Sequence, residues 1–214
     1  MQDKNNLPLF PIGLVLLPGM VIPLHLFEER YKNMANRCLE KSEPFGIVYY
    51  SGNKMNELGC TAEIIEVIKK YPDGRMDILI EGKERFKINN TNSDELCLQA
   101  DISFFDDEYE TTGENLEASK KEAVILLKEI MKFYGSGGED IDFIDFDPKI
   151  VSFLVTSNSS FTMDEKQSFL EMINTRERLE KAVKALKIIV ERVKVAVSIE
   201  QIIQSNGYLP KKHD

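Results

Sequence analysis

Few of the side chains that most often carry out catalysis occur in this 214-residue chain, and they are scattered. The two histidines are His25, within an apolar stretch, and His213, near the end of the chain. The sequence contains neither G-x-S-x-G, which places a serine nucleophile on a sharp turn, nor H-E-x-x-H, which places two zinc ligands on one helix face. We interpret His25 as a histidine at the end of a strand. A hydrolase would have to act through residues that no motif marks, so catalytic residues are not predicted.

A second stretch that could do chemistry is the acidic and aromatic segment 139–147, which holds five carboxylates. Carboxylate oxygens bind Ca²⁺ and Mg²⁺, but the segment lacks the D-x-D-x-D-G spacing of a calcium loop. We interpret it as a solvated acidic loop, and neither a metal nor a cofactor is predicted. The phosphate-binding pattern G-x-x-x-x-G-K-[ST] is also absent from the sequence, so no ATPase module is expected in it.

Composition indicates which kinds of partner are unlikely and in which cellular compartment the protein resides. The net charge of −9, from 27 basic and 36 acidic side chains, argues against a broad nucleic-acid surface, because such surfaces need clustered cations. The cysteines Cys38, Cys60 and Cys97 lie far apart and form no C-x-x-C pair, which is typical of buried thiols in a reducing compartment. The first residues lack the layout of a signal peptide, and the apolar run from Leu7 is too short to span a bilayer. We expect a cytoplasmic protein without membrane association.

The elements that would position any site begin with residues 7–31. Four prolines exclude a continuous helix there, because proline fixes φ and has no backbone donor. The pair Pro18-Gly19 has the chemistry of a turn, with proline at the second position and glycine at the third. The stretch predicts two short apolar strands, around 14–17 and 20–22, joined at this turn. Helical spacing of apolar residues then predicts a helix over 28–41.

The rest of the first half alternates short apolar runs with turn signals. Strands are predicted at 45–50, 60–70, 76–81, 85–88 and 96–105, a loop at 51–59, a hairpin turn at 71–75 and a further turn at 82–84. The hairpin depends on Pro72-Asp73-Gly74, in which proline presets φ and glycine accepts a positive φ. Six or seven short strands with hairpin-length connections indicate a small sandwich or barrel with one inserted helix.

The second half changes to a helical period after the acidic segment 101–114, which we interpret as the boundary between two lobes, 1–112 and 113–214. Apolar spacing and capping signals predict helices over 116–134, 149–156, 162–173 and 175–197. The basic side chains of the last helix either face water or pair with the acidic segments. The sequence thus predicts an α+β protein, in which a β lobe precedes a helical bundle that ends in a long helix.

Several motifs occur in the order in which one known family has them. They are PLFPIGLVLLPGMVIPLHLFEERY, Gly59-Cys60-Thr61-Ala62-Glu63-Ile64, Asp73-Gly74-Arg75, Gly82-Lys83-Glu84-Arg85-Phe86, and Lys166-Gln167 with Leu170-Glu171 and Arg178-Leu179. Together they cover roughly residues 7–200 and are similar to the N-terminal substrate-recognition domain of the ATP-dependent Lon protease family. The resemblance implies a PUA-like β-pseudobarrel followed by a helical bundle. It also implies capture of unfolded or tagged polypeptides, and self-association.

On this basis the sequence predicts a non-enzymatic polypeptide-binding module, an adaptor in protein quality control that works with an ATP-dependent protease in trans. The polypeptide would bind in an apolar groove between pseudobarrel and bundle, or add a strand to a barrel edge. The candidate contact residues are Met20, Val21 and Phe27 near the Pro-Gly turn, and Phe143 and Phe146 in the acidic loop. The two loop phenylalanines either pack on the core or stay exposed as a binding patch. The alternative is RNA binding, because PUA-like barrels also occur in RNA-modifying proteins, and the charge of −9 counts against it.

Overall fold

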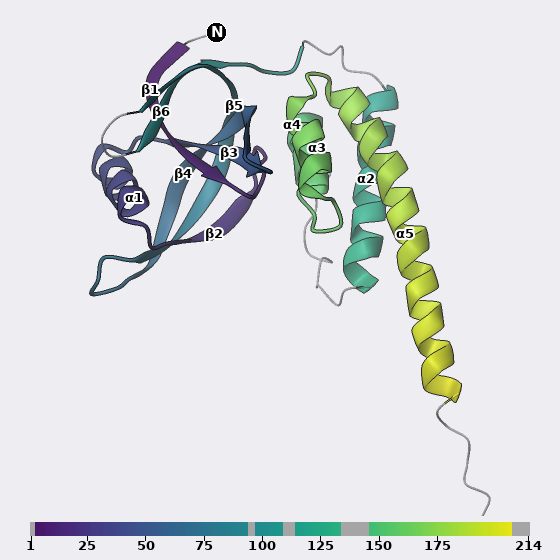
Figure 1. Ribbon diagram of the computed structural model, residues 1–214. Coiled ribbons are helices and arrows are strands. Elements are labelled where there is room, and N and C mark those ends of the chain that lie inside the picture. The colour runs from purple at the N-terminus through teal and green to yellow at the C-terminus, as the bar shows by residue number, and fades with distance from the viewer. Residues whose placement is uncertain (1–2, 94–96, 109–113, 134–145, 207–214) are drawn as a thin grey trace, which may run out of the picture.

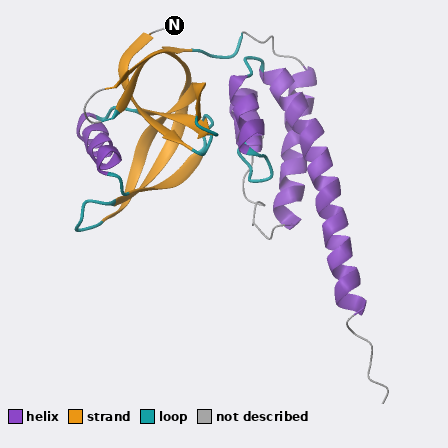
Figure 2. Ribbon diagram, in the orientation of Figure 1, coloured by secondary structure: helices purple, strands orange, loops and turns teal. Residues whose placement is uncertain are grey.

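The computed structural model describes residues 3–93, 97–108, 114–133 and 146–206 of the chain. A β-rich lobe and a helical lobe lie side by side (Figures 1 and 2). The elements of the first lobe are β1 (Asp3–Ile12), β2 (Val21–Leu26), α1 (Glu29–Lys41), β3 (Phe45–Ser51), β4 (Lys54–Lys70), β5 (Met76–Ser93) and β6 (Leu98–Phe104). Those of the second are α2 (Glu114–Phe133), α3 (Pro148–Thr156), α4 (Met163–Glu171) and α5 (Thr175–Asn206).

The strands form one six-stranded sheet in the order β2-β5-β4-β3-β1-β6, and pairing of β5 with β6 closes it into a barrel. Among the described strands, β1 and β3 pair in parallel, and the other pairs are antiparallel. The predicted α+β class and the barrel with one inserted helix are confirmed. The predicted hairpin is also present, since Lys70 pairs with Met76 and Gly74 has a φ of +82°.

Two turns predicted from polar residues are not where the sequence placed them. The predicted loop 51–59 is mostly strand, because a tight turn at Gly52-Asn53 with positive φ values lets β4 begin at Lys54. The predicted turn 82–84 is wrong, because β5 runs through it without a break. Register shifts in the β4–β5 ladder, such as the one between Cys60 and Ala62, bend the two strands around the barrel. Bulges therefore bend the chain where the sequence analysis expected a turn.

The Pro18-Gly19 turn forms as predicted. The amide of Met20 donates to the carbonyl of Leu17 at 3.0 Å, and Gly19 has a φ of +76°, as a type II turn requires. The apolar run before it, 14–17, is not a strand, although Val15, Leu16 and Leu17 are buried. Of the two strands predicted on either side of this turn, the second is present as the start of β2, but the first is absent. The strand before the turn is β1, which ends at Ile12 and pairs with β3 and β6, while β2 pairs with β5. The turn is instead fixed to β5 by two backbone bonds between Gly82 and the segment 19–20.

The helical lobe is built around α2 and α5, which run in the same direction. Their ion pairs repeat at seven-residue intervals, Glu122 with Lys187 at 2.7 Å and Glu129 with Lys194 at 3.1 Å. The predicted caps are present at the start of α3, where the Asp147 carboxylate accepts from the amide of Lys149, and at α4, where Thr162 forms a capping box with Glu165. The last helix continues to Asn206, beyond the predicted end at 197.

The two lobes share buried apolar surface. Phe153 of α3 and Leu170 of α4 belong to the same buried cluster as barrel residues such as Phe45 and Ile80. The boundary predicted between 112 and 113 lies within 109–113, outside the described residues, and stays a prediction. None of the helices in the described ranges is long and apolar enough to cross a membrane.

Candidate functional site

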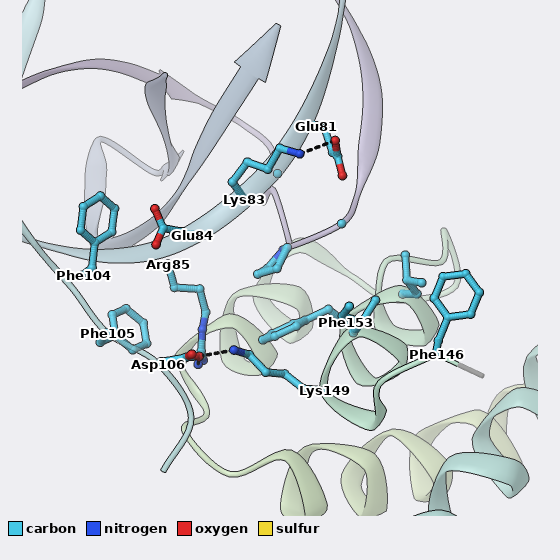
Figure 3. Close-up of a pocket in the computed structure, with 15 residues that line it drawn as sticks. Glu81, Lys83, Glu84, Arg85, Phe104, Phe105, Asp106, Phe146, Lys149 and Phe153 are labelled. Atoms are coloured by element: carbon cyan, nitrogen blue, oxygen red, sulfur yellow. Dashed lines mark hydrogen bonds and ion pairs between the residues drawn. The ribbon is translucent and has the colours of Figure 1, made fainter. Parts of the chain in front are cut away.

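A groove with a volume of about 550 Å³ lies where the Pro18-Gly19 turn, β5, the end of β6 and α3 meet (Figure 3). It is therefore located at the junction of the two lobes. Its apolar lining consists of Pro18, Phe104, Phe105, Phe146, Ile150, Phe153 and Leu154. Its charged lining consists of Glu81, Lys83, Glu84, Arg85, Asp106 and Lys149.

The floor of the groove is a buried aromatic ring held between two buried arginines. Phe153 is fully buried, and the guanidinium carbon of Arg178 lies 3.9 Å from the centroid of its ring. The guanidinium of Arg85 lies 5.1 Å from the same centroid and 4.6 Å from that of Phe105. Stacking on aromatic faces suits the planar arginine side chain and fixes the position of the floor.

Both arginines bind one carboxylate. Arg85, Arg178 and Thr175 all donate hydrogen bonds to Asp107, whose side chain is almost completely buried. Burial alone would raise the pKa of Asp107, but the bonds from Arg178 and Thr175 and the charges of the two arginines outweigh it and lower that pKa. Arg85 also donates to the carbonyls of Leu170 and Met172. The guanidiniums are thus engaged by protein groups, and this network connects β5, the segment after β6, and α5.

Both lysines at the rim of the groove are paired with carboxylates. Lys83 lies 2.6 Å from Glu81, and Lys149 lies 2.5 Å from Asp106. Figure 3 shows these two pairs on different sides of the opening. A rim of paired charges around phenylalanine and isoleucine side chains favours apolar groups of a ligand over phosphates or free carboxylates.

The predicted contact residues are only partly brought together. Phe146 lines the groove and is partly exposed, and Val21 pairs with Glu81 at its edge. Met20 is half-buried and packs against the barrel core. Phe27 is 63% exposed, but it follows the far end of β2, about 20 Å along the strand from Val21. The predicted residue Phe143 lies outside the described residues.

Sequence reasoning missed the groove residues on α3 and β6. Ile150 is exposed on the side of α3 away from the buried Val151 and Val155, and Leu154 is half-buried beside it. Ile150 lies outside the buried face of a short helix, and an exposed apolar residue of this kind can indicate a binding site. Recognising it would have required knowing which face of α3 is buried. Phe105 was assigned to the end of a strand, and nothing local indicated that it faces α3.

His25 takes part in a surface network instead of the groove. Its Nδ1 lies 2.5 Å from Asp77, its partner in the β2–β5 ladder, and Tyr71 donates to the same carboxylate at 2.8 Å. The hydrogen bond with His25 is the main reason that the pKa of Asp77 is lowered. The pairing across two strands supports the interpretation of His25 as a structural residue. The described residues hold no cluster of three or more histidine, cysteine or acidic side chains that could bind a metal ion.

The barrel edge offers a poorer route for an incoming strand. Among the described strands, β2 pairs with β5 alone, so its second side is an edge. Because Gly82 donates to Met20, the alternation of the ladder turns the backbone groups of Val21, Pro23 and His25 away from β5. Pro23 has no amide hydrogen to offer at the centre of this edge. A polypeptide strand that added to this edge would lack one backbone hydrogen bond at Pro23. The groove is therefore the better candidate for the polypeptide-binding site.

Known protein families include relatives that match most of this chain. A sequence model described as the ATP-dependent protease La (LON) substrate-binding domain matches residues 6–188. The chain is 24% identical over 223 residues to Lon protease of Flavobacterium johnsoniae, a match that covers 95% of this chain and 27% of the relative. It is 27% identical over 203 residues to Lon protease of Clostridium acetobutylicum, covering 87% of this chain and 25% of the relative. The chain thus spans about a quarter of the length of these relatives.

Two solved structures have the same fold. The first is a Lon N-terminal domain protein from Xanthomonas campestris, with a TM-score of 0.66 and 21% identity, covering 86% of this chain and 98% of that one. The second is the N-terminal domain of Lon protease from the Mycobacterium avium complex, with a TM-score of 0.69 and 19% identity, covering 87% and 98%. Both matches extend over most of this chain, in agreement with the expected order of a PUA-like barrel and a helical bundle.

Proposed function

The chain belongs to the family of substrate-binding domains of the ATP-dependent protease La (LON), and from this premise we propose that it is a polypeptide-binding module and not an enzyme. The observation that carries the proposal is the groove at the junction of the lobes, with its apolar lining and paired rim charges. Unfolded chains differ from folded ones in exposing apolar side chains. An apolar groove therefore binds unfolded chains in preference to folded ones.

The dimensions of the groove support an extended polypeptide as the ligand. About 550 Å³ accommodates two or three side chains, and the stacked guanidiniums of Arg85 and Arg178 hold the floor at Phe153 in place. Phe146 stands on the α3 side, and Phe104 and Phe105 stand on the barrel side (Figure 3). Ile150 belongs to α3 itself. A polypeptide would place apolar side chains between these two walls, with its backbone along the polar rim. Val21, at the edge, is a candidate for extending the contact.

The proposal also covers the partner protein and the cellular compartment. We infer that the module presents bound polypeptides to an ATP-dependent protease in trans, as an adaptor, because the family takes its description from substrate binding in such a protease. The cytoplasm is the compartment we propose, which agrees with the buried, reduced thiols of Cys38 and Cys60. Binding of RNA finds no support at the groove, where Lys83 and Lys149 are each paired with a carboxylate.

The test is fluorescence anisotropy with a labelled, permanently unfolded protein and two matched aspartate variants. In Ile150→Asp the new carboxylate stands in the groove, and in Ile125→Asp it stands on α2, where Ile125 is 65% exposed and is not part of the groove lining. We expect Ile150→Asp to weaken binding by roughly tenfold or more, because a ligand would bury an unpaired charge. We expect Ile125→Asp to bind like the wild type.

Two further measurements make the result specific. Phe27→Ala tests the exposed aromatic residue after the far end of β2, and the groove proposal requires that it change affinity little. Excess single-stranded RNA should not displace the labelled polypeptide. Equal binding by wild type and Ile150→Asp, with both variants folded, would contradict the groove as the site. Absence of binding by the wild type would contradict the proposed function itself.

A further inference from the structure

One carboxylate in the lining of the groove has no ion pair within the described part of the chain. It belongs to Glu84 of β5, whose side chain is exposed. Both lysines of the lining are already paired with other carboxylates, and Lys83 has a second acidic neighbour, Glu63, at 3.6 Å. The accessible surface of the groove therefore carries more negative than positive charge, and Glu84 is the part of that charge left to attract a cation.

The backbone fixes the place of Glu84 at the barrel wall of the groove. The hydroxyl of Thr61 accepts from the amide of Glu84 at 3.0 Å and donates to its carbonyl at 3.3 Å. The amide of Phe105 donates to the carbonyl of Arg85, the next residue of β5, at 3.2 Å. Figure 3 shows Glu84 next to Phe104, with no dashed line to its carboxylate. The free carboxylate thus stands beside the aromatic wall at the end of β6.

The positive charge beneath the groove is out of reach of a ligand. Arg85 and Arg178 are 2% and 0% exposed. Asp107 neutralises one of these two charges, and the guanidiniums also donate to the carbonyls of Leu170 and Met172. A carboxylate of a ligand would have to displace hydrogen bonds that are already made. A cation of a ligand, in contrast, meets an exposed carboxylate.

An aromatic ring beside Glu84 adds to the attraction for a cation. Phe104 is half-buried and lines the same wall. Within the described ranges no cation lies over its ring, whereas the ring of Phe105 already has the guanidinium of Arg85 at 4.6 Å. A guanidinium binds a carboxylate through two parallel N–H groups and also stacks on aromatic faces, so arginine suits this place better than lysine.

We propose that the groove prefers polypeptide segments in which an arginine or a lysine lies next to the apolar residues that fill it, and that Glu84 selects this cation. The inference rests on the proposed function, since it names the class of polypeptide that the same groove takes. Residues of an extended chain are about 3.3 Å apart, so a basic residue one or two positions from an apolar residue at Phe105 lies within reach of Glu84. The same carboxylate disfavours acidic segments.

The test compares three labelled peptides that share one apolar sequence and differ only in their flanking residues, which are arginine, glutamine or glutamate. Fluorescence anisotropy gives the three affinities for each protein, and the ratio between the arginine and glutamate peptides cancels any change in overall binding. For the wild type we expect a ratio of about ten, because an attraction replaces a repulsion of similar size at an exposed carboxylate. At about 0.5 M salt the ratio should fall towards one, because the charges are screened.

Charge variants assign the preference to one residue. Glu84→Gln should lower the ratio to about three or less, and Glu84→Arg should reverse the order of the arginine and glutamate peptides. Glu66→Arg is the matched control, because Glu66 is exposed on β4, is not part of the groove lining, and the substitution changes the net charge by the same amount as Glu84→Arg. Its ratio should match that of the wild type.

The outcomes separate this inference from the function on which it rests. Equal binding of the three peptides by the wild type, or a wild-type ratio in Glu84→Arg, would overturn the role of Glu84 while the groove remains a polypeptide site. An equal loss of the ratio in Glu66→Arg would overturn it as well, because the preference would then follow net charge alone. A glutamine peptide that does not bind the wild type would overturn the proposed function, and this inference with it.

Discussion

Arg85 and Arg178 donate to the same carboxylate, that of Asp107, and to the same carbonyl oxygen, that of Met172. One arginine comes from β5 and the other from α5, so the pair joins the barrel to the helical lobe. Their guanidiniums also stack on Phe153, the floor of the groove. The geometry of the groove therefore depends on a buried network with two cations and one anion.

The first prediction concerns the anion. Asp107→Asn removes the carboxylate that the two buried guanidiniums share and leaves Arg85 only its longer contact of 3.6 Å with the exposed Asp106. Removing one partner of a buried pair costs about 3 kcal/mol or more of unfolding free energy. Asp106→Asn is the matched control, because Asp106 is exposed and pairs with Lys149 at 2.5 Å on the surface. Its loss should cost less than about 1 kcal/mol. Urea unfolding measures both, and equal costs would contradict a special role for Asp107.

The second prediction is the pH dependence of the same network. The pKa of Asp107 is lowered in the folded state, because the bonds and charges from Arg178, Thr175 and Arg85 outweigh burial. The stabilisation is therefore complete above the unfolded pKa of about 3.9 and is lost as pH falls through the lower folded pKa. The unfolding free energy of wild type should fall more steeply than that of Asp107→Asn between about pH 5 and pH 2. Parallel curves would show that Asp107 titrates normally.

The third prediction is about thiol reactivity. Burial raises the pKa of Cys38 to about 11 and that of Cys60 to about 12, so neither forms the reactive thiolate near neutral pH. Cys97 is half-buried. A chromogenic disulfide reagent at about pH 8 should modify no more than Cys97 in the native protein, and all three thiols after denaturation. Rapid native modification of Cys38 or Cys60 would show that the barrel opens readily.

The turns and helix caps that depend on neighbouring residues were predicted best from the sequence. The Pro18-Gly19 turn, the hairpin before Met76 and the capping box at Thr162 each depend on residues close together in the chain, and all three form. The turn expected at 82–84 failed because bulges in β4 and β5 bend the barrel there, and a bulge has no strong local signal.

The site was harder to predict than the fold. The sequence placed Arg85 at the start of a predicted strand, 85–88, and its bonds to Asp107 and Met172 join residues that only the tertiary fold brings together. The alternative that basic residues of the last helix pair with the acidic segment 101–114 is realised by Arg178 and Asp107. Exposed apolar residues such as Phe27 and Phe146 looked equivalent in sequence. Their positions, after the far end of β2 and beside α3, separate them.

The last prediction links the Pro-Gly turn to the groove through Gly82. The amide of Gly82 donates to Met20 at 2.9 Å, and its carbonyl accepts from Gly19 at 2.8 Å, which holds the turn against β5. A methyl group on Gly82 would overlap the carbonyl oxygen of Leu17, a backbone atom that cannot rotate away. Gly82→Ala should therefore displace the turn and lower the unfolding free energy by about 1–3 kcal/mol.

Because Pro18 and Gly19 line the groove, the same substitution should also weaken binding of the labelled unfolded protein, even at temperatures where the variant is fully folded. Gly13→Ala is the control, since a methyl group there would meet only the carbonyl of Tyr50 at 4.0 Å. Its stability and affinity should match the wild type. A Gly82→Ala variant that loses stability but keeps full affinity would show that the turn is a structural support and that the ligand contacts only the α3 wall.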